Sequence, residues 1–148
     1  MNSASKCVWT VIAGLVVAAS ALAQPRVIQD VEYARAGEVS LRLDLYLPEG
    51  QGTHPLIVWI HGGAFRAGDK GSIFWSPMPR QTERGYAVAS INYRLSGQAL
   101  FPALVYDCKA AIRWLRANAD KYNLAAGRIV VAGESAGGHL AALLGTSG

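Results

Sequence analysis

Three short apolar runs, in which polar and apolar side chains do not alternate, place the strongest limit on how this chain can fold. They occupy residues 55–60 (PLIVWI), 86–91 (YAVASI) and 129–132 (IVVA). A strand with one buried face alternates polar and apolar residues, whereas a continuous run is typical of a strand buried on both faces. The runs therefore predict a parallel sheet covered by helices on both sides.

Amphipathic helical segments separate the predicted strands. Within residues 102–119, Pro102 suits a first helical position and the charged residues fall on one side. The apolar residues at helical spacing are Leu104, Cys108, Ala111, Ile112 and Leu115. Another helix, rich in Ala and Leu, begins near Ala136. Strands and helices in alternation predict an α/β fold.

An antiparallel hairpin is predicted ahead of the parallel strands, from residues 27–33 and 39–47. With this hairpin included, we expect a sheet that is mostly parallel. In the second strand, leucines alternate with Arg42, Asp44 and Tyr46. This period of two predicts a strand with one buried and one polar face.

The first 23 residues have the layout of a secretory signal peptide. Lys6 precedes an uncharged apolar run over residues 8–23, which ends in an A-x-A cleavage site at Ala21, Leu22 and Ala23. The alternative, a membrane anchor, needs roughly 20 apolar residues. We therefore expect a periplasmic or secreted protein whose domain occupies residues 24–148, with no stable membrane anchor after cleavage.

Composition narrows the classes of partner. The 148 residues are 51% hydrophobic and 16% charged, which fits one globular domain. The net charge is +4 and the basic residues are scattered, so nucleic acid is not an expected partner. Cysteine and histidine do not cluster at metal-ligand spacing, and we expect neither a metal nor a cofactor.

The sequence GESAG at residues 133–137 is the strongest chemical signal. It is a G-x-S-x-G pattern between the strand predicted at 129–132 and the helix near Ala136. So tight a turn needs both glycines and presents Ser135 at its tip. A plain glycine-rich turn is the alternative, but in this setting the pattern predicts a serine nucleophile.

A second glycine-rich segment, HGGAF at residues 61–65, follows the strand predicted at 55–60. Its backbone N–H groups can approach the oxyanion of a tetrahedral intermediate because no side chains block them. We predict an oxyanion hole formed by the N–H groups of Gly63, Ala64 and Ala136. His61 is expected to anchor this loop by hydrogen bonds rather than to act as the base.

Aromatic and charged residues near this loop are secondary candidates. Phe65, Phe74 and Trp75 are candidates for lining a substrate pocket, with ordinary packing as the alternative. The charged residues between positions 66 and 70 are expected to form a solvated loop. Arg94, at the end of a predicted central strand, is expected to be a structural tie.

Together these segments resemble α/β-hydrolases of the hormone-sensitive-lipase type, in their bacterial carboxylesterase and feruloyl-esterase-like (BD-FAE-like) branch. The resemblance covers about residues 43–148 and rests on DLYLP, HGGAF, GYAVASINYRLS, FPALVYDCKAAIRWLRANA and GESAGGHLAALLG. It implies the α/β-hydrolase fold and a serine carboxylic-ester hydrolase with an acyl-serine intermediate. Similar proteins usually carry a third glycine at the position of Ala64, so this loop has less conformational freedom.

In this fold the triad acid and histidine follow the serine in chain order. The thirteen residues after Ser135 hold no Asp or Glu, and their one histidine, His139, lies on the helix that leads away. Asp107 is a poor acid because it lies near a helix start, where it complements the dipole. We expect the acid and histidine beyond residue 148, and the chain as given, which ends soon after the serine, to be inactive.

Two other functions remain open. A serine exopeptidase can use the same fold, and a non-catalytic relative can serve as a binding module, although a binding module has no need of a strained serine turn. For the esterase, small-molecule and polysaccharide-linked esters are both expected substrates.

Overall fold

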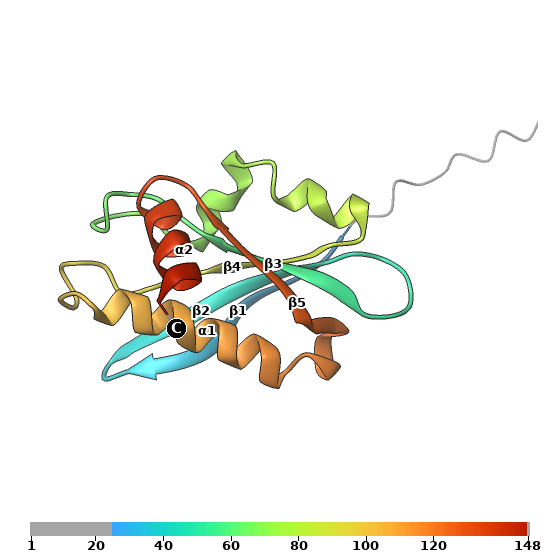
Figure 1. Ribbon diagram of the computed structural model, residues 1–148, viewed down its shortest axis with the longest axis horizontal. Coiled ribbons are helices and arrows are strands. Elements are labelled where there is room, and N and C mark those ends of the chain that lie inside the picture. The colour runs from blue at the N-terminus through green and yellow to red at the C-terminus, as the bar shows by residue number, and fades with distance from the viewer. Residues whose placement is uncertain (1–24, 148) are drawn as a thin grey trace, which may run out of the picture.

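The computed structural model describes residues 25–147, which form one five-stranded sheet with helices packed against it (Figure 1). The strands are β1 (Arg26–Ala36), β2 (Val39–Leu47), β3 (His54–Ile60), β4 (Ala87–Ile91) and β5 (Leu124–Gly133), in the order β1-β2-β4-β3-β5. β3 runs parallel to both β4 and β5, while β2 is antiparallel to both β1 and β4. The predicted antiparallel hairpin and parallel strands are confirmed, although β5 begins before residue 129. The sheet of the described residues is partly rather than mostly parallel, because two of its four strand pairings are antiparallel.

Two α-helices, α1 (Ala103–Ala117) and α2 (Ala136–Thr146), cover one face of the sheet. Pro102 is the residue that caps α1 rather than its first helical residue. The 3-10 helices η1 (Lys70–Trp75) and η2 (Pro79–Arg84), green in Figure 1, lie on the opposite face, and η3 (Asp120–Tyr122) precedes β5. Among residues 25–147, no helix combines the length and the hydropathy needed to span a membrane.

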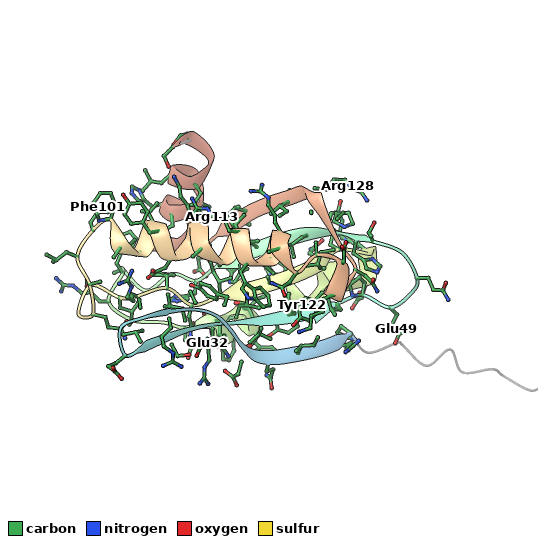
Figure 2. All side chains as sticks on the ribbon, turned by 90° about the horizontal axis from the view of Figure 1, so that it is seen from below. Glu32, Glu49, Phe101, Arg113, Tyr122 and Arg128 are labelled. Carbon is green, nitrogen blue, oxygen red and sulfur yellow. The ribbon has the colours of Figure 1, made fainter. Side chains whose placement is uncertain are left out.

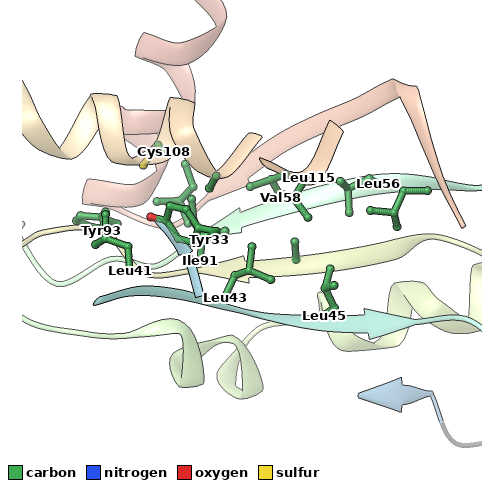
Figure 3. Close-up of a cluster of buried hydrophobic side chains, with 14 of the residues drawn as sticks. Tyr33, Leu41, Leu43, Leu45, Leu56, Val58, Ile91, Tyr93, Cys108 and Leu115 are labelled. Atoms are coloured by element: carbon green, nitrogen blue, oxygen red, sulfur yellow. The ribbon is translucent and has the colours of Figure 1, made fainter. Parts of the chain in front are cut away.

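The main core lies between the sheet and the two α-helices (Figure 3). Leu43 and Val58 point from the strands toward Cys108 and Leu115 of α1, and all four side chains are fully buried. Each such leucine contributes roughly 1.5–3 kcal/mol relative to an exposed one. The apolar stripe predicted for the helix is therefore confirmed.

From Leu43 to Leu47, β2 is buried on both faces, which corrects the prediction of one polar face there, while Arg42 is exposed as predicted. Asp44 and Tyr46 are only 2% and 1% exposed. After β3 the chain folds back as η1, whose Ile73 packs against Tyr46 and Trp59, while Lys70 reaches Asp44. The alternation misleads because a segment distant in sequence covers the second face.

β5 forms one edge of the sheet. Ile129 and Val131 pack against the main core, but Val130 is 59% exposed on the other face. The prediction of a strand buried on both faces is thus wrong for β5 within the described residues. An edge strand presents a row of N–H and C=O groups to which another strand can pair.

An ion pair joins the chain after β4 to α1. Asp107, which is buried, accepts hydrogen bonds from Nε and Nη2 of Arg94 at 2.8 and 2.7 Å and from the Arg94 backbone N–H at 3.0 Å. The structural tie predicted for Arg94 is confirmed. Asp107 turns toward this partner, so its main role is the tie and not the helix dipole.

We predict that Cys108 resists thiol reagents in the folded protein. Its side chain is fully buried, and burial raises the pKa of the thiol above its ordinary value, so little reactive thiolate is exposed. Iodoacetamide treatment followed by peptide mapping should show modified Cys108 only in urea. A Thr53→Cys variant, exposed before β3, serves as the reactive control. Native labelling of Cys108 as fast as that of the control would contradict the burial.

Candidate active site

The site is built where three parallel strands end. β3 lies between β4 and β5, so the residues after Ile60 sit between those after Ile91 and those after Gly133. The carboxyl ends of parallel strands meet at one edge of the sheet, which is where open α/β sheets bind their ligands. The two glycine-rich segments of the sequence therefore lie at the same edge.

The serine turn, residues 133–137, holds Ser135 in a strained conformation. Ser135 is exposed at the start of α2 and has φ 52° and ψ −117°, a region that costs a non-glycine residue about 1–3 kcal/mol. A Cβ on Gly133 would lie 2.4 Å from the carbonyl carbon of Gly137, and a Cβ on Gly137 would lie 2.0 Å from the carbonyl oxygen of Ile60. The turn therefore depends on glycine at both positions.

The glycine-rich loop, residues 61–69, turns back on itself directly after β3. The Gly63 carbonyl accepts hydrogen bonds from the N–H groups of Arg66 and Ala67 at 2.9 and 3.0 Å. Gly63 has φ 108°, and the two residues after it, Ala64 and Phe65, also have positive φ values of 52° and 62°. Ala64 thus occupies a left-handed position that favours glycine, which explains why a third glycine suits this place.

The glycine-rich loop and the serine turn touch each other. A Cβ on Gly62 would lie 3.0 Å from the Glu134 carbonyl oxygen and 3.4 Å from Cβ of Ser135. Within residues 25–147, the N–H groups of Gly63, Ala64 and Ala136 donate no hydrogen bond to another protein group. Free N–H groups beside a helix N-terminus can stabilise an anionic oxygen.

His61 anchors the start of the glycine-rich loop by hydrogen bonds and by ring stacking. Its side chain is buried, its Nδ1–H donates to the Gly62 carbonyl at 2.7 Å, and its ring stacks on Tyr93 with centroids 4.4 Å apart. The Tyr93 hydroxyl donates to the His61 carbonyl at 3.0 Å. Burial lowers the pKa of the His61 imidazole, which favours the neutral ring. The anchoring geometry predicted for His61 is present.

An apolar hollow of about 300 Å³ opens beside the loop, and Phe65 lines it. The ring of His139, one turn along α2, packs edge-on against Phe65 with centroids 6.0 Å apart. Leu100 and Phe101 line the same hollow and are exposed, and Figure 2 shows Phe101 beyond the N-terminal end of α1. The remaining lining residues are Ser96, Ala99, Leu104, Leu140 and Leu143.

Phe74 and Trp75, the other two candidates for lining a substrate pocket, do not line this hollow. They belong to η1 on the opposite face of the sheet, where the Phe74 ring packs edge-on against Tyr46 at 6.1 Å. Both are largely exposed. The reason is the fold-back of the chain at Lys70, which carries the next residues away from the serine turn.

The BD-FAE family model matches residues 43–148, which is more than half of the chain. The chain belongs to the BD-FAE family. Its five-stranded sheet is part of the α/β-hydrolase fold, as the solved structures of similar esterases indicate. The family resemblance and the fold predicted from the sequence are both confirmed.

Curated relatives of this BD-FAE chain include two proteins of Mycobacterium tuberculosis. "Carboxylic ester hydrolase LipN" is 39% identical over 112 residues, which cover 74% of this chain and 29% of LipN. "Esterase LipC" is 38% identical over 91 residues, which cover 62% of this chain and 23% of LipC. The chain therefore spans less than a third of the length of these two relatives.

Solved structures similar to this chain also belong to longer proteins, of which it covers only part. A bifunctional GH43-CE protein of Bacteroides eggerthii has a TM-score of 0.75 and 42% identity, with 82% of this chain and 17% of that one covered. An esterase of Pyrobaculum calidifontis has a TM-score of 0.73 and 34% identity, with 82% of this chain and 39% of that one covered.

The solvated loop predicted for residues 66–70 is confirmed for residues 66–69, which are exposed, and is wrong for Lys70, which belongs to a polar cluster. Lys70 is half-buried and paired with Asp44, and Asp69 caps η1 by accepting from the Gly71 N–H. The one signal for this cluster in the sequence is the carboxylate of Asp44, placed among the leucines of β2.

We predict that Gly137→Ala lowers the free energy of unfolding by about 3 kcal/mol or more, because its Cβ would meet the Ile60 carbonyl oxygen at 2.0 Å. The matched control is Gly145→Ala on the same helix, where a Cβ meets nothing within 4 Å. That change should raise stability by about 0.5–1 kcal/mol through helix propensity. Urea unfolding of both variants tests the difference, and equal stabilities would contradict the close packing of the serine turn.

Proposed function

We propose that the full-length protein is a secreted serine carboxylic-ester hydrolase that acts through an acyl-Ser135 intermediate. By full-length we mean the chain together with residues that we propose follow Gly148. The observation that carries the proposal is the contact between the strained Ser135 turn and a loop in which the N–H groups of Gly63 and Ala64 are free. The names of the relatives, esterases and carboxylic ester hydrolases, support the same reaction.

In the proposed reaction, the Ser135 hydroxyl oxygen attacks the ester carbonyl carbon while a histidine base takes its proton. The electron pair of the C=O bond moves to oxygen, and the N–H groups of Gly63, Ala64 and Ala136 stabilise the resulting oxyanion. One such donor is worth about 2.7–4 kcal/mol in comparable sites. The alcohol leaves with the proton, and water then hydrolyses the acyl-serine to free acid and Ser135.

We propose that residues after Gly148 supply the histidine and its acid. His139 is a poor candidate because it lies on α2 and packs against Phe65, and the Asp107 carboxylate is engaged by Arg94. The short coverage of the relatives, 23% of LipC and 29% of LipN, leaves ample room for both groups in a longer chain.

The substrates we propose are carboxylic esters with an apolar or aromatic group. The hollow beside Phe65 lies next to the glycine-rich loop and is lined largely by aliphatic and aromatic side chains. The solved structure of a "truncated form of carbohydrate esterase from gut microbiota" is similar to this chain, at 38% identity and a TM-score of 0.71. Feruloyl or acetyl esters on polysaccharides therefore belong in the substrate screen. The signal-like residues 1–23, which lie outside the described residues, support secretion or a periplasmic location.

We predict that Ser135→Ala abolishes ester hydrolysis by the full-length protein, because the variant lacks the attacking hydroxyl. p-Nitrophenyl acetate and an aryl amide, assayed beside the wild type and a Ser40→Ala control on β2, test this. Loss of ester hydrolysis in Ser135→Ala, with activity kept in Ser40→Ala, supports the esterase function. Faster amide than ester cleavage by the wild type would favour an exopeptidase, and no turnover would favour a binding module.

We further predict that residues 24–148 alone show no ester turnover and associate in solution. β5 is an edge strand with Val130 exposed, and an apolar edge favours pairing between chains. Light scattering and the ester assay measure both properties. A monomeric, active fragment would contradict the proposal that later residues complete the triad.

A further inference from the structure

Lys70, the half-buried residue directly after the glycine-rich loop, forms an ionic contact with the buried Asp44. We propose that this Asp44–Lys70 clamp positions the loop for oxyanion stabilisation, so that both residues are positioning residues of the esterase reaction. The inference rests on the proposed function and adds to it two residues that touch no reacting atom.

The side chain of Lys70 is fixed by two carboxylates. Its Nζ lies 2.9 Å from Oδ1 and 3.0 Å from Oδ2 of Asp44, and 3.0 Å from Oδ1 of Asp30. Asp44 is 2% exposed and also accepts the Asp30 backbone N–H at 2.8 Å. The lysine is therefore bound to β1 and β2, on the face of the sheet away from α1.

The backbone of Lys70 is fixed as well. Its N–H donates to the Asn92 side-chain oxygen at 2.7 Å, and its carbonyl accepts from the Ser90 hydroxyl at 2.7 Å. Ser90 belongs to β4 and Asn92 follows it. All three polar groups of Lys70 are thus held by the sheet, which makes this residue the fixed far end of the loop.

The loop needs two fixed ends because its own conformation is strained. Two of its non-glycine residues, Ala64 and Phe65, have positive φ values of 52° and 62°. Such conformations persist only where the surroundings over-determine them. β3 and the Tyr93–His61 hydrogen bond fix the near end, and the Asp44–Lys70 clamp fixes the far end.

Stability alone is a weak explanation for an ion pair whose carboxylate, Asp44, is buried. Replacing an ion pair by apolar groups of similar volume is often neutral for stability, whereas the pair fixes one geometry of the groups around it. A small displacement of catalytic donors can cost up to about 100-fold in rate. The clamp should therefore act on kcat more than on folding or on KM.

The test compares full-length variants with the wild type on p-nitrophenyl acetate. The double variant Asp44→Asn/Lys70→Met removes the clamp without leaving a buried charge unpaired. The single variant Lys70→Arg keeps Asp44 and places another cation beside it. Arg35→Met is the matched control, because it removes the exposed Glu32–Arg35 pair on β1. Urea unfolding establishes that each variant is folded.

We expect kcat of the double variant to fall about 10- to 100-fold with KM within about twofold of the wild type. Lys70→Arg should recover most of kcat, and Arg35→Met should match the wild type. A trifluoromethyl ketone that forms an oxyanion on Ser135 should bind the double variant more weakly by a similar factor. A ground-state product acid should bind it equally well.

Two results would overturn the inference. If the wild type is active and the folded double variant retains kcat and ketone affinity, the positioning role of the clamp is wrong, while the proposed function stands. If the wild type shows no ester turnover, both the proposed function and the positioning role of the clamp are wrong. A parallel loss of kcat in Arg35→Met would also count against a specific role of the clamp.

Discussion

At Gly137 the start of α2 comes so close to β3 that a Cβ would lie 2.0 Å from the Ile60 carbonyl oxygen. This backbone contact sets the distance between the serine turn and the loop that follows β3. Because β3 ends at Ile60, the same contact brings Gly62 against Glu134 and Ser135. The whole site depends on two backbones that approach as closely as glycine allows.

The sequence predicts the parts of this site that follow from local rules. Gly133 and Gly137 flank a serine between a strand and a helix, and this pattern is enough to predict the turn. The long helix and its buried Cys108 follow from periodicity in the same way. Both depend on residues near one another in the chain, where spacing and conformation are directly linked.

The features that the sequence does not reveal depend on contacts between distant segments. Asp44 and Tyr46 alternate with leucines, which normally indicates a solvent face, yet η1 covers them from about 26 residues later in the chain. Phe74 and Trp75 follow the glycine-rich loop closely in sequence but lie on the opposite face. In each case the fold-back at Lys70 decides the outcome, and no local pattern encodes it.

The strand order also bears on how the chain acquires its structure. β3 precedes both of its neighbours in the sequence, since β4 and β5 are added later on either side of it. The pairing of Leu56 with Ile129 closes a segment of more than 70 residues. Non-local pairings of this kind slow folding, because chain entropy is lost before the contact forms. β3, which leads into the glycine-rich loop, is therefore synthesised before both of its partner strands, and its pairing with β5 forms late in folding.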